Sequence, residues 1–195
     1  MRLATLALAL APAATLALAE PVAAQEAHDW TVDASHSSVL FKVKHMNVSW
    51  FFGRFIDFEG KIHFDPTEPA KNSVELDVKT QSVRTWSRDR DDHLKGPDFF
   101  NVAEFPLMTF RSKAVEKAGE DRFRVTGDFT LHGVTKEIAV EVEKTGEGTG
   151  LRGEPRIGFY TEFRIKRSDY GMTTYVAEGA VGDEVTVILS LEATR

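Results

Sequence analysis

The chain has 195 residues, of which 42% are hydrophobic and 28% are charged, and it contains no cysteine. This length and composition are typical of one globular domain and exclude a disordered, collagen-like or coiled-coil chain. Without cysteine there can be no disulfide, thiolate metal site, thiol nucleophile or lipid-modified N-terminal cysteine. The formal net charge of −6 argues against a nucleic acid bound through its phosphates.

The first 24 residues have the features of a secretory signal peptide. Arg2 precedes an uncharged run rich in Ala and Leu, and small residues crowd the end of the segment. We expect cleavage after Ala24, with Ala19 as the second choice, and a periplasmic protein whose single domain comprises residues 25–195. The alternative is an uncleaved membrane anchor, for which the apolar run is short and is broken by Pro12.

Alternation of apolar and polar residues dominates the rest of the chain and is typical of half-buried antiparallel strands. The alternation is clearest at residues 39–44, 56–64, 74–79, 137–143 and 185–191, and further strands fit near residues 30–33, 107–115, 123–131 and 157–165. The pattern predicts an all-β fold of about eight or nine strands. Because an open sheet would expose its edges, we expect a closed barrel or a sandwich.

Three segments depart from this alternation. Residues 45–52 carry apolar residues without a period of two and predict a short helix or turn. Residues 84–95 carry charges at helical spacing, and Gly96-Pro97 ends the predicted helix. The glycine-rich residues 145–155 predict a peripheral loop.

A series of motifs is distributed along the whole chain. In order they are Ser35-His36-Ser37, Gly53-Arg54-Phe55, Arg90-Asp91-Asp92-His93-Leu94, Asp98-Phe99-Phe100, Gly127-Asp128-Phe129-Thr130-Leu131-His132-Gly133 and Arg167-Ser168-Asp169-Tyr170-Gly171-Met172. In this order and spacing the chain resembles the exported YceI-like family of polyisoprenoid-binding proteins, from about residue 30 to residue 191. The resemblance implies an extended lipocalin-like antiparallel barrel of about eight strands with one or two short helices. It also implies a binding protein, not an enzyme.

The ligand implied by the resemblance is an isoprenoid-type lipid, such as a prenyl pyrophosphate or a quinone tail, held for transport, storage or sequestration. Residues expected to line the interior are Phe41, Val43, Phe58, Leu76, Leu94, Phe99, Phe100, Phe110, Phe129 and Phe163. The chain has 14 Phe and 3 Tyr, so its aromatic residues bring few hydroxyl groups that would need a partner in a dry tube. The alternative is a stress-related barrel in which these residues pack a filled core without a ligand.

The polar residues allow several interpretations. By the resemblance, His36, His45 and Arg90 are candidates to contact the ligand's head group. The charged cluster at residues 84–95 is otherwise a solvated helix, or places Asp91 and His93 as an acid–base pair of a lipid pyrophosphate hydrolase.

No nucleophile motif and no metal-ligand spacing of the histidines accompany these residues. We therefore expect no catalytic residue, no metal and no cofactor apart from a bound lipid. Transient membrane contact for lipid exchange and a homodimer formed through exposed strands are the expected partnerships.

Overall fold

The computed structural model describes residues 26–195, so the predicted signal peptide lies outside the described residues. The strands are β1 (His28–Val32), β2 (Ser38–His45), β3 (Ser49–Phe55), β4 (Phe58–Phe64), β5 (Ser73–Lys79), β6 (Val83–Arg84), β7 (Leu107–Lys117), β8 (Arg122–Leu131), β9 (Val134–Thr149), β10 (Pro155–Lys166) and β11 (Val181–Thr194). The helices are α1 (Arg88–Lys95) and three 3-10 turns, η1 (Pro69–Lys71), η2 (Thr80–Ser82) and η3 (Arg167–Tyr170). None of these helices has the length and apolarity that a membrane-spanning segment requires.

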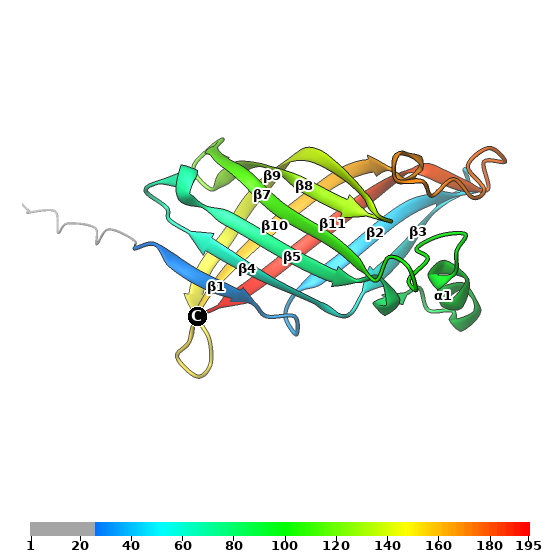
Figure 1. Ribbon diagram of the computed structural model, residues 1–195. Helices are drawn as coiled ribbons and strands as arrows, with labels where there is room; N and C mark the ends of the chain where they lie inside the picture. The colour runs from blue at the N-terminus through cyan, green and yellow to red at the C-terminus, as the bar shows by residue number, and fades with distance from the viewer. Residues whose placement is uncertain (1–25) are drawn as a thin grey trace, which may run out of the picture.

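These strands form a closed antiparallel barrel (Figure 1). Three long strands of the barrel are interrupted and consist of two short strands each: β1 with β2, β3 with β4, and β5 with β6. In the sheet, β1 and β2 pair with β4 and β3, which pair in turn with β5 and β6. The barrel therefore has eight long strands in up-and-down order, and it closes where β11 pairs with both β1 and β2. Closure satisfies the backbone groups that an open sheet would leave at its edges. The predicted all-β, lipocalin-like barrel is confirmed.

Alternation along each strand separates the interior from the solvent. In β10, Ile157, Phe159 and Ile165 are buried, whereas Glu162 and Arg164, which point the other way, are exposed. The same period of two recurs in β8, where every second residue from Phe123 to Leu131 is buried. The apolar half of each strand therefore faces a common interior.

The segment predicted as a short helix or turn is instead a β-hairpin. The β2–β3 connection consists of residues 46–48, and its first two residues, Met46 and Asn47, have positive φ angles of 49° and 56°. The Val48 N–H donates to the His45 carbonyl at 3.0 Å, and β3 begins at once. The alternation was hidden because Trp50 and Phe52 are apolar residues on the outer face of the strand.

The loop predicted at residues 145–155 is shorter than expected. Strand β9 continues to Thr149, and its residues 146–149 pair with β10 across a register shift that leaves Thr145 as the extra residue. Glycine is unusual inside a strand but is common at such bulges, where the chain must bend. Only residues 150–154 form the connecting turn.

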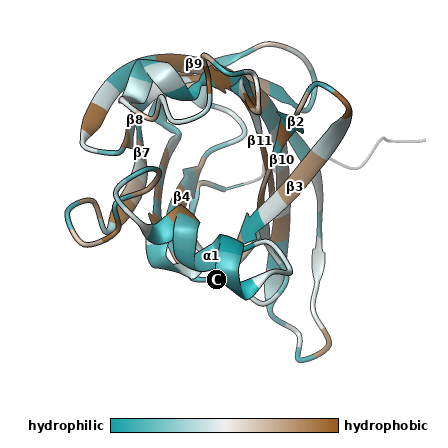
Figure 2. Cartoon of the chain, turned by 90° about the vertical axis from the view of Figure 1, so that its right-hand side faces the viewer, coloured by the Kyte–Doolittle hydropathy of each residue, from teal (hydrophilic) through white to brown (hydrophobic). Residues whose placement is uncertain are grey.

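Helix α1 lies at one end of the barrel (Figure 1). Asp89 and Asp91 occupy its first turn and Lys95 its last, which is the arrangement that complements a helix dipole. Figure 2, which looks onto this end, shows α1 as a hydrophilic helix beside the end of the barrel. The predicted helix is confirmed, although it begins at Arg88 and not at Arg84.

Two glycines make room for aromatic rings on the inner wall. Gly53 lies directly opposite Phe41 in the sheet, and a Cβ at this position would collide with the Phe41 ring. A Cβ at Gly127 would meet the Phe110 ring and the backbone of the neighbouring strand. Glycine at these points therefore lets both phenylalanines lie close against the backbone.

Candidate ligand-binding cavities

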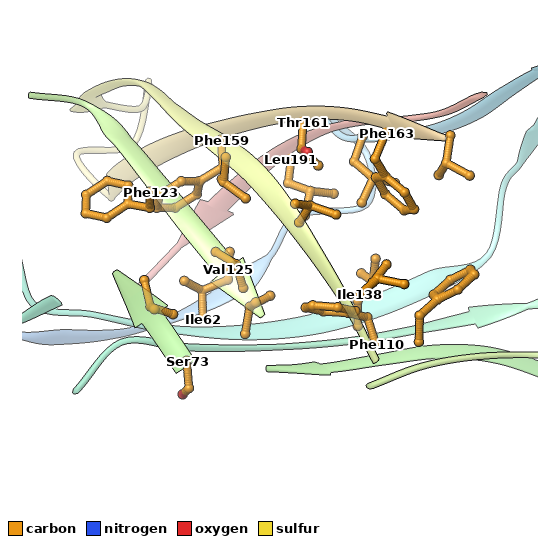
Figure 3. A pocket seen from close by; sticks show the side chains of 18 of the residues that line it. Ile62, Ser73, Phe110, Phe123, Val125, Ile138, Phe159, Thr161, Phe163 and Leu191 are labelled. Atoms are coloured by element: carbon orange, nitrogen blue, oxygen red, sulfur yellow. The ribbon is translucent and has the colours of Figure 1, made fainter. Parts of the chain in front are cut away.

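The barrel encloses a large apolar cavity, which we call the first cavity. It holds about 1000 Å³ of empty space and is lined by residues of β2, β4, β5 and β7–β11. In Figure 3, Phe159, Phe163 and Leu191 lie on one side of this space and Ile62, Phe110 and Ile138 on the other. Its accessible lining is apolar.

A second cavity of about 680 Å³ lies toward the α1 end of the barrel. Its lining includes Phe41 and Phe55 from the barrel wall and Leu94 and Phe100 from the segment that contains α1. The Phe100 ring packs edge-on against Phe55, with centroids 5.4 Å apart. The irregular segment around α1 thus caps this cavity with apolar side chains.

The two cavities adjoin each other in the interior. Val39, Met108 and Val187 line both of them. The two cavities therefore meet at these three side chains. Together the cavities form a long apolar space, which matches an extended ligand better than a compact one.

Polar groups near the first cavity are mostly satisfied by the protein. Thr161 lines the cavity, but its hydroxyl donates to the Glu141 carbonyl at 2.7 Å. Asn72 also lines it, and its Oδ1 accepts from the Asp65 N–H at 2.6 Å. The Asn72 Nδ2 is buried without a hydrogen-bond partner in the described residues.

The structure brings together nine of the ten residues predicted to line the interior. Leu76, Phe110, Phe129 and Phe163 line the first cavity, and Phe41, Val43, Leu94, Phe99 and Phe100 line the second. The tenth residue, Phe58, is 7% exposed and packs in the hydrophobic core, but it lines neither cavity. The alternation of apolar and polar residues in β4 predicts that Phe58 points inward. It does not predict how far the cavities extend along the interior.

The two histidines predicted to contact a head group lie away from both cavities. His36 is exposed in the β1–β2 connection, with its Nδ1 2.8 Å from Asp33 Oδ2. His45 is exposed at the end of β2. Neither lines a cavity.

Arg90 also lies outside the cavities, in α1, and it contacts residues that precede the helix in the chain. Its guanidinium lies 4.4 Å from the centre of the Phe51 ring, and its Nη2 donates to the Thr85 carbonyl at 2.6 Å. Asp91 is buried and accepts hydrogen bonds from the Thr85 N–H and hydroxyl at 2.7 and 2.5 Å. His93 instead bonds Asp98 at 3.2 Å. Asp91 and His93 therefore serve different partners and make no acid–base pair.

Arg167 is a buried charge on the lining of the second cavity that the sequence analysis did not select. It is 4% exposed and donates to four backbone carbonyls, those of Met172, Thr174, Val181 and Gly182, at 2.7–2.9 Å. Burial lowers the pKa of the guanidinium, and the charge of Asp183 opposes that shift. The signal was present in the alternation, because Arg167 continues the inward series of Phe163 and Ile165.

A second arginine, Arg156, organises a charged cluster on the outer surface. Its guanidinium contacts Asp33 at 3.2 Å, Glu154 at 2.6 Å and Glu192. Hydrogen bonding to His36, and more weakly to Arg156, lowers the pKa of Asp33, and hydrogen bonding to Arg156 lowers that of Glu154. Asp33, His36 and Glu192 have ligand atoms within 4.8 Å of one another, but the guanidinium already supplies the positive charge that a metal ion would bring.

A closed up-and-down barrel with a long apolar interior defines the class of lipocalin-like binding proteins. The sequence pattern of the YceI-like domain family matches residues 30–193. The chain therefore belongs to the YceI-like family.

Known proteins are similar over most of the chain. Protein YceI of Salmonella newport (strain SL254) is 39% identical over 163 residues, which cover 84% of each chain. The crystal structure of Burkholderia cenocepacia BcnA is similar with a TM-score of 0.76 and 29% identity, and the match covers 83% of this chain and 98% of BcnA. A polyisoprenoid binding domain from Saccharophagus degradans, implicated in plant cell wall breakdown, has the same fold with a TM-score of 0.64 and 20% identity. That match covers 85% of this chain and 97% of the domain.

Proposed function

We propose that this protein binds the apolar chain of an isoprenoid-type lipid inside its barrel. The observation that carries the proposal is the pair of adjoining apolar cavities inside the barrel. Membership of the YceI-like family supports it, as does the name of the Saccharophagus domain with the same fold. The cargo is a prenyl pyrophosphate or a quinone tail, held for transport, storage or sequestration after export to the periplasm.

Burial of the apolar chain supplies the binding free energy. Each buried methylene contributes about 0.8 kcal/mol, so ten of them contribute about 8 kcal/mol before the cost of ordering the ligand. Because His36, His45 and Arg90 line neither cavity and the accessible lining of both cavities is apolar, this proposal assigns the affinity to the apolar chain and names no head-group contact. Binding is passive and needs no catalytic residue or cofactor.

Two observations weigh against the alternative functions. A filled core without ligand would leave little empty space, whereas two adjoining apolar cavities remain inside the barrel. A pyrophosphate hydrolase would need Asp91 and His93 to act together, but Asp91 is buried against Thr85 and His93 bonds Asp98. The binding function is therefore the one that the geometry favours.

Native mass spectrometry of the exported protein, followed by solvent extraction, tests this proposal. We expect a stoichiometric adduct with the mass of an isoprenoid lipid, or uptake of added quinone or prenyl phosphate by the empty protein. A protein that carries no lipid and takes up neither probe would contradict the proposal. Turnover of an added prenyl pyrophosphate that is lost on Asp91→Asn would favour the hydrolase.

A further inference from the structure

Exposed aromatic and basic side chains alternate across the outer face of β2, β3 and β6. Trp50 and Phe52 of β3 are each 47% exposed, although both are large apolar residues. The sheet register places Lys44 opposite Trp50 and Arg84 opposite Arg54. These side chains share one face, because residues 50, 52 and 54 all point away from the interior.

Trp86 extends this face beyond β6. It is 74% exposed, and the guanidinium of Arg54 lies 5.9 Å from the centre of its ring. Its φ angle of 60° is a strained conformation for a bulky side chain, and the bonds from Thr85 to Asp91 hold the adjoining backbone in place. The fold thus holds Trp86 in a strained backbone conformation with its side chain exposed to solvent. Packing in the hydrophobic core does not explain this residue.

We call this surface, formed by Lys44, Trp50, Phe52, Arg54, Arg84 and Trp86, the tryptophan face. Its charge is opposite in sign to that of the whole chain, which is −6. Among the described residues, the three cations of this face form no salt bridge with a carboxylate, whereas the adjacent Lys42 pairs with Glu162 at 3.0 Å. The face therefore combines exposed aromatic rings with positive charge that the protein does not neutralise.

We propose that the tryptophan face docks on the surface of an anionic phospholipid bilayer. Tryptophan side chains favour the membrane–water interface, and lysine and arginine beside them are attracted to anionic head groups. A second copy of the chain fits this face poorly. A two-fold interface would set the same three cations against one another.

Docking at this face would bring the membrane close to the second cavity. Strands β2 and β3 present the tryptophan face outward, while Phe41, Val43 and Phe55 of the same strands line the second cavity. The β2–β3 hairpin also reaches the end of the barrel that carries α1 (Figure 1). This role in exchanging an apolar chain with the membrane rests on the proposed function, but docking itself does not require a bound lipid.

Vesicle flotation of the mature protein tests the docking. The probe vesicles are pure phosphatidylcholine, or phosphatidylcholine with roughly one third phosphatidylglycerol. We expect flotation with the anionic vesicles only, and its loss when the salt concentration is raised to about 0.5 M. The combined changes Lys44→Glu and Arg54→Glu should lower binding by about 20-fold or more. Trp50→Ser with Trp86→Ser should also lower it, without changing net charge.

A matched control separates this face from the overall charge. Lys117→Glu with Arg124→Glu makes the same charge change at two exposed positions on β7 and β8. This control should float like the unaltered protein. An equal loss in the control, or no flotation of the unaltered protein, would overturn the proposal.

Two further measurements distinguish docking from cargo binding and from self-association. The Lys44→Glu, Arg54→Glu variant should take up quinone in native mass spectrometry as the unaltered protein does. If the unaltered protein floats but takes up no lipid, docking stands and the proposed function fails. A stable dimer in light scattering that Trp50→Ser dissociates would instead make a second copy the occupant and overturn docking.

Discussion

The two ends of the barrel are built around arginines at opposite ends of the same strand. Arg156 lies near the start of β10, and Arg167 follows its last residue. Arg156 binds carboxylates on the outer surface, whereas Arg167 binds backbone carbonyls in the interior. The Arg156 guanidinium neutralises surface carboxylates, and the Arg167 guanidinium donates hydrogen bonds to buried backbone carbonyls.

This difference follows from how each half of the interior is enclosed. Strands wall the first cavity, and the sheet itself pairs their backbone groups. The second cavity is closed by α1, η3, the connection to β11 and the first residues of β11, whose pairing with β2 is irregular. A buried cation therefore replaces the missing hydrogen-bond donors at that end. At this end the protein buries the charge of Arg167 beneath apolar side chains of the segment that contains α1.

The largest expected effect is that of Arg167→Met. The substitution leaves four carbonyls without their donor, and an unsatisfied buried group costs about 1–3 kcal/mol. We expect urea denaturation to show a loss of roughly 3 kcal/mol or more in the free energy of unfolding. Arg164→Met, at an exposed position three residues earlier, should change it by less than about 0.5 kcal/mol. Similar losses in the two variants would contradict the role assigned to Arg167.

The cap should open separately from the strands when Phe100 is truncated. Phe100→Ala removes the ring that packs on Phe55, and we expect a local cost of about 2 kcal/mol. Amide hydrogen exchange in residues 88–101 should then be about 30-fold faster, with little change in β8. Phe123→Ala, which removes a ring packed on Phe64 in the strand-walled half, should accelerate exchange across the barrel. A uniform response to both variants would show that the two halves open together.

Filling the first cavity should weaken lipid binding without unfolding the protein. Ile138→Trp displaces roughly two methylenes of ligand, worth about 0.8 kcal/mol each, so affinity for a quinone should fall about 10- to 20-fold. Glu141→Trp places the same side chain on the exposed face of the same strand and should bind normally. Fluorescence titration measures both affinities. Unchanged affinity in Ile138→Trp would place the ligand elsewhere.

The smallest expected effect is the pH dependence of the Arg156 cluster. The pKa values of Asp33 and Glu154 are lowered in the folded protein, so ionisation of these carboxyls stabilises the fold above their ordinary pKa values of 3.8 and 4.5. That contribution is lost as pH falls through the lowered values. Arg156→Met should therefore reduce stability at pH 7, and the difference should shrink near pH 3. Denaturant titrations at both pH values measure it, and a difference independent of pH would exclude the ionic origin.

The sequence by itself determined the all-β class and the inward position of many strand residues. The physical reason is that a strand's period of two shows in the residues, so inward positions such as Phe110, Phe129 and Phe163 could be identified. It also located α1 through charge spacing. The family resemblance, carried by motifs spread along the chain, supplied the class of ligand.

Only the tertiary structure decided where the empty space lies and which polar groups reach it. Phe58 and Phe129 look alike in the sequence, yet only Phe129 lines a cavity, because packing across the barrel sets the space that remains. His36 and Arg90 carry the chemistry of a head-group site but are held by Asp33 and Thr85. Arg167 acquired its place because carbonyls of the connection to β11 and of the irregular start of β11 converge on its guanidinium.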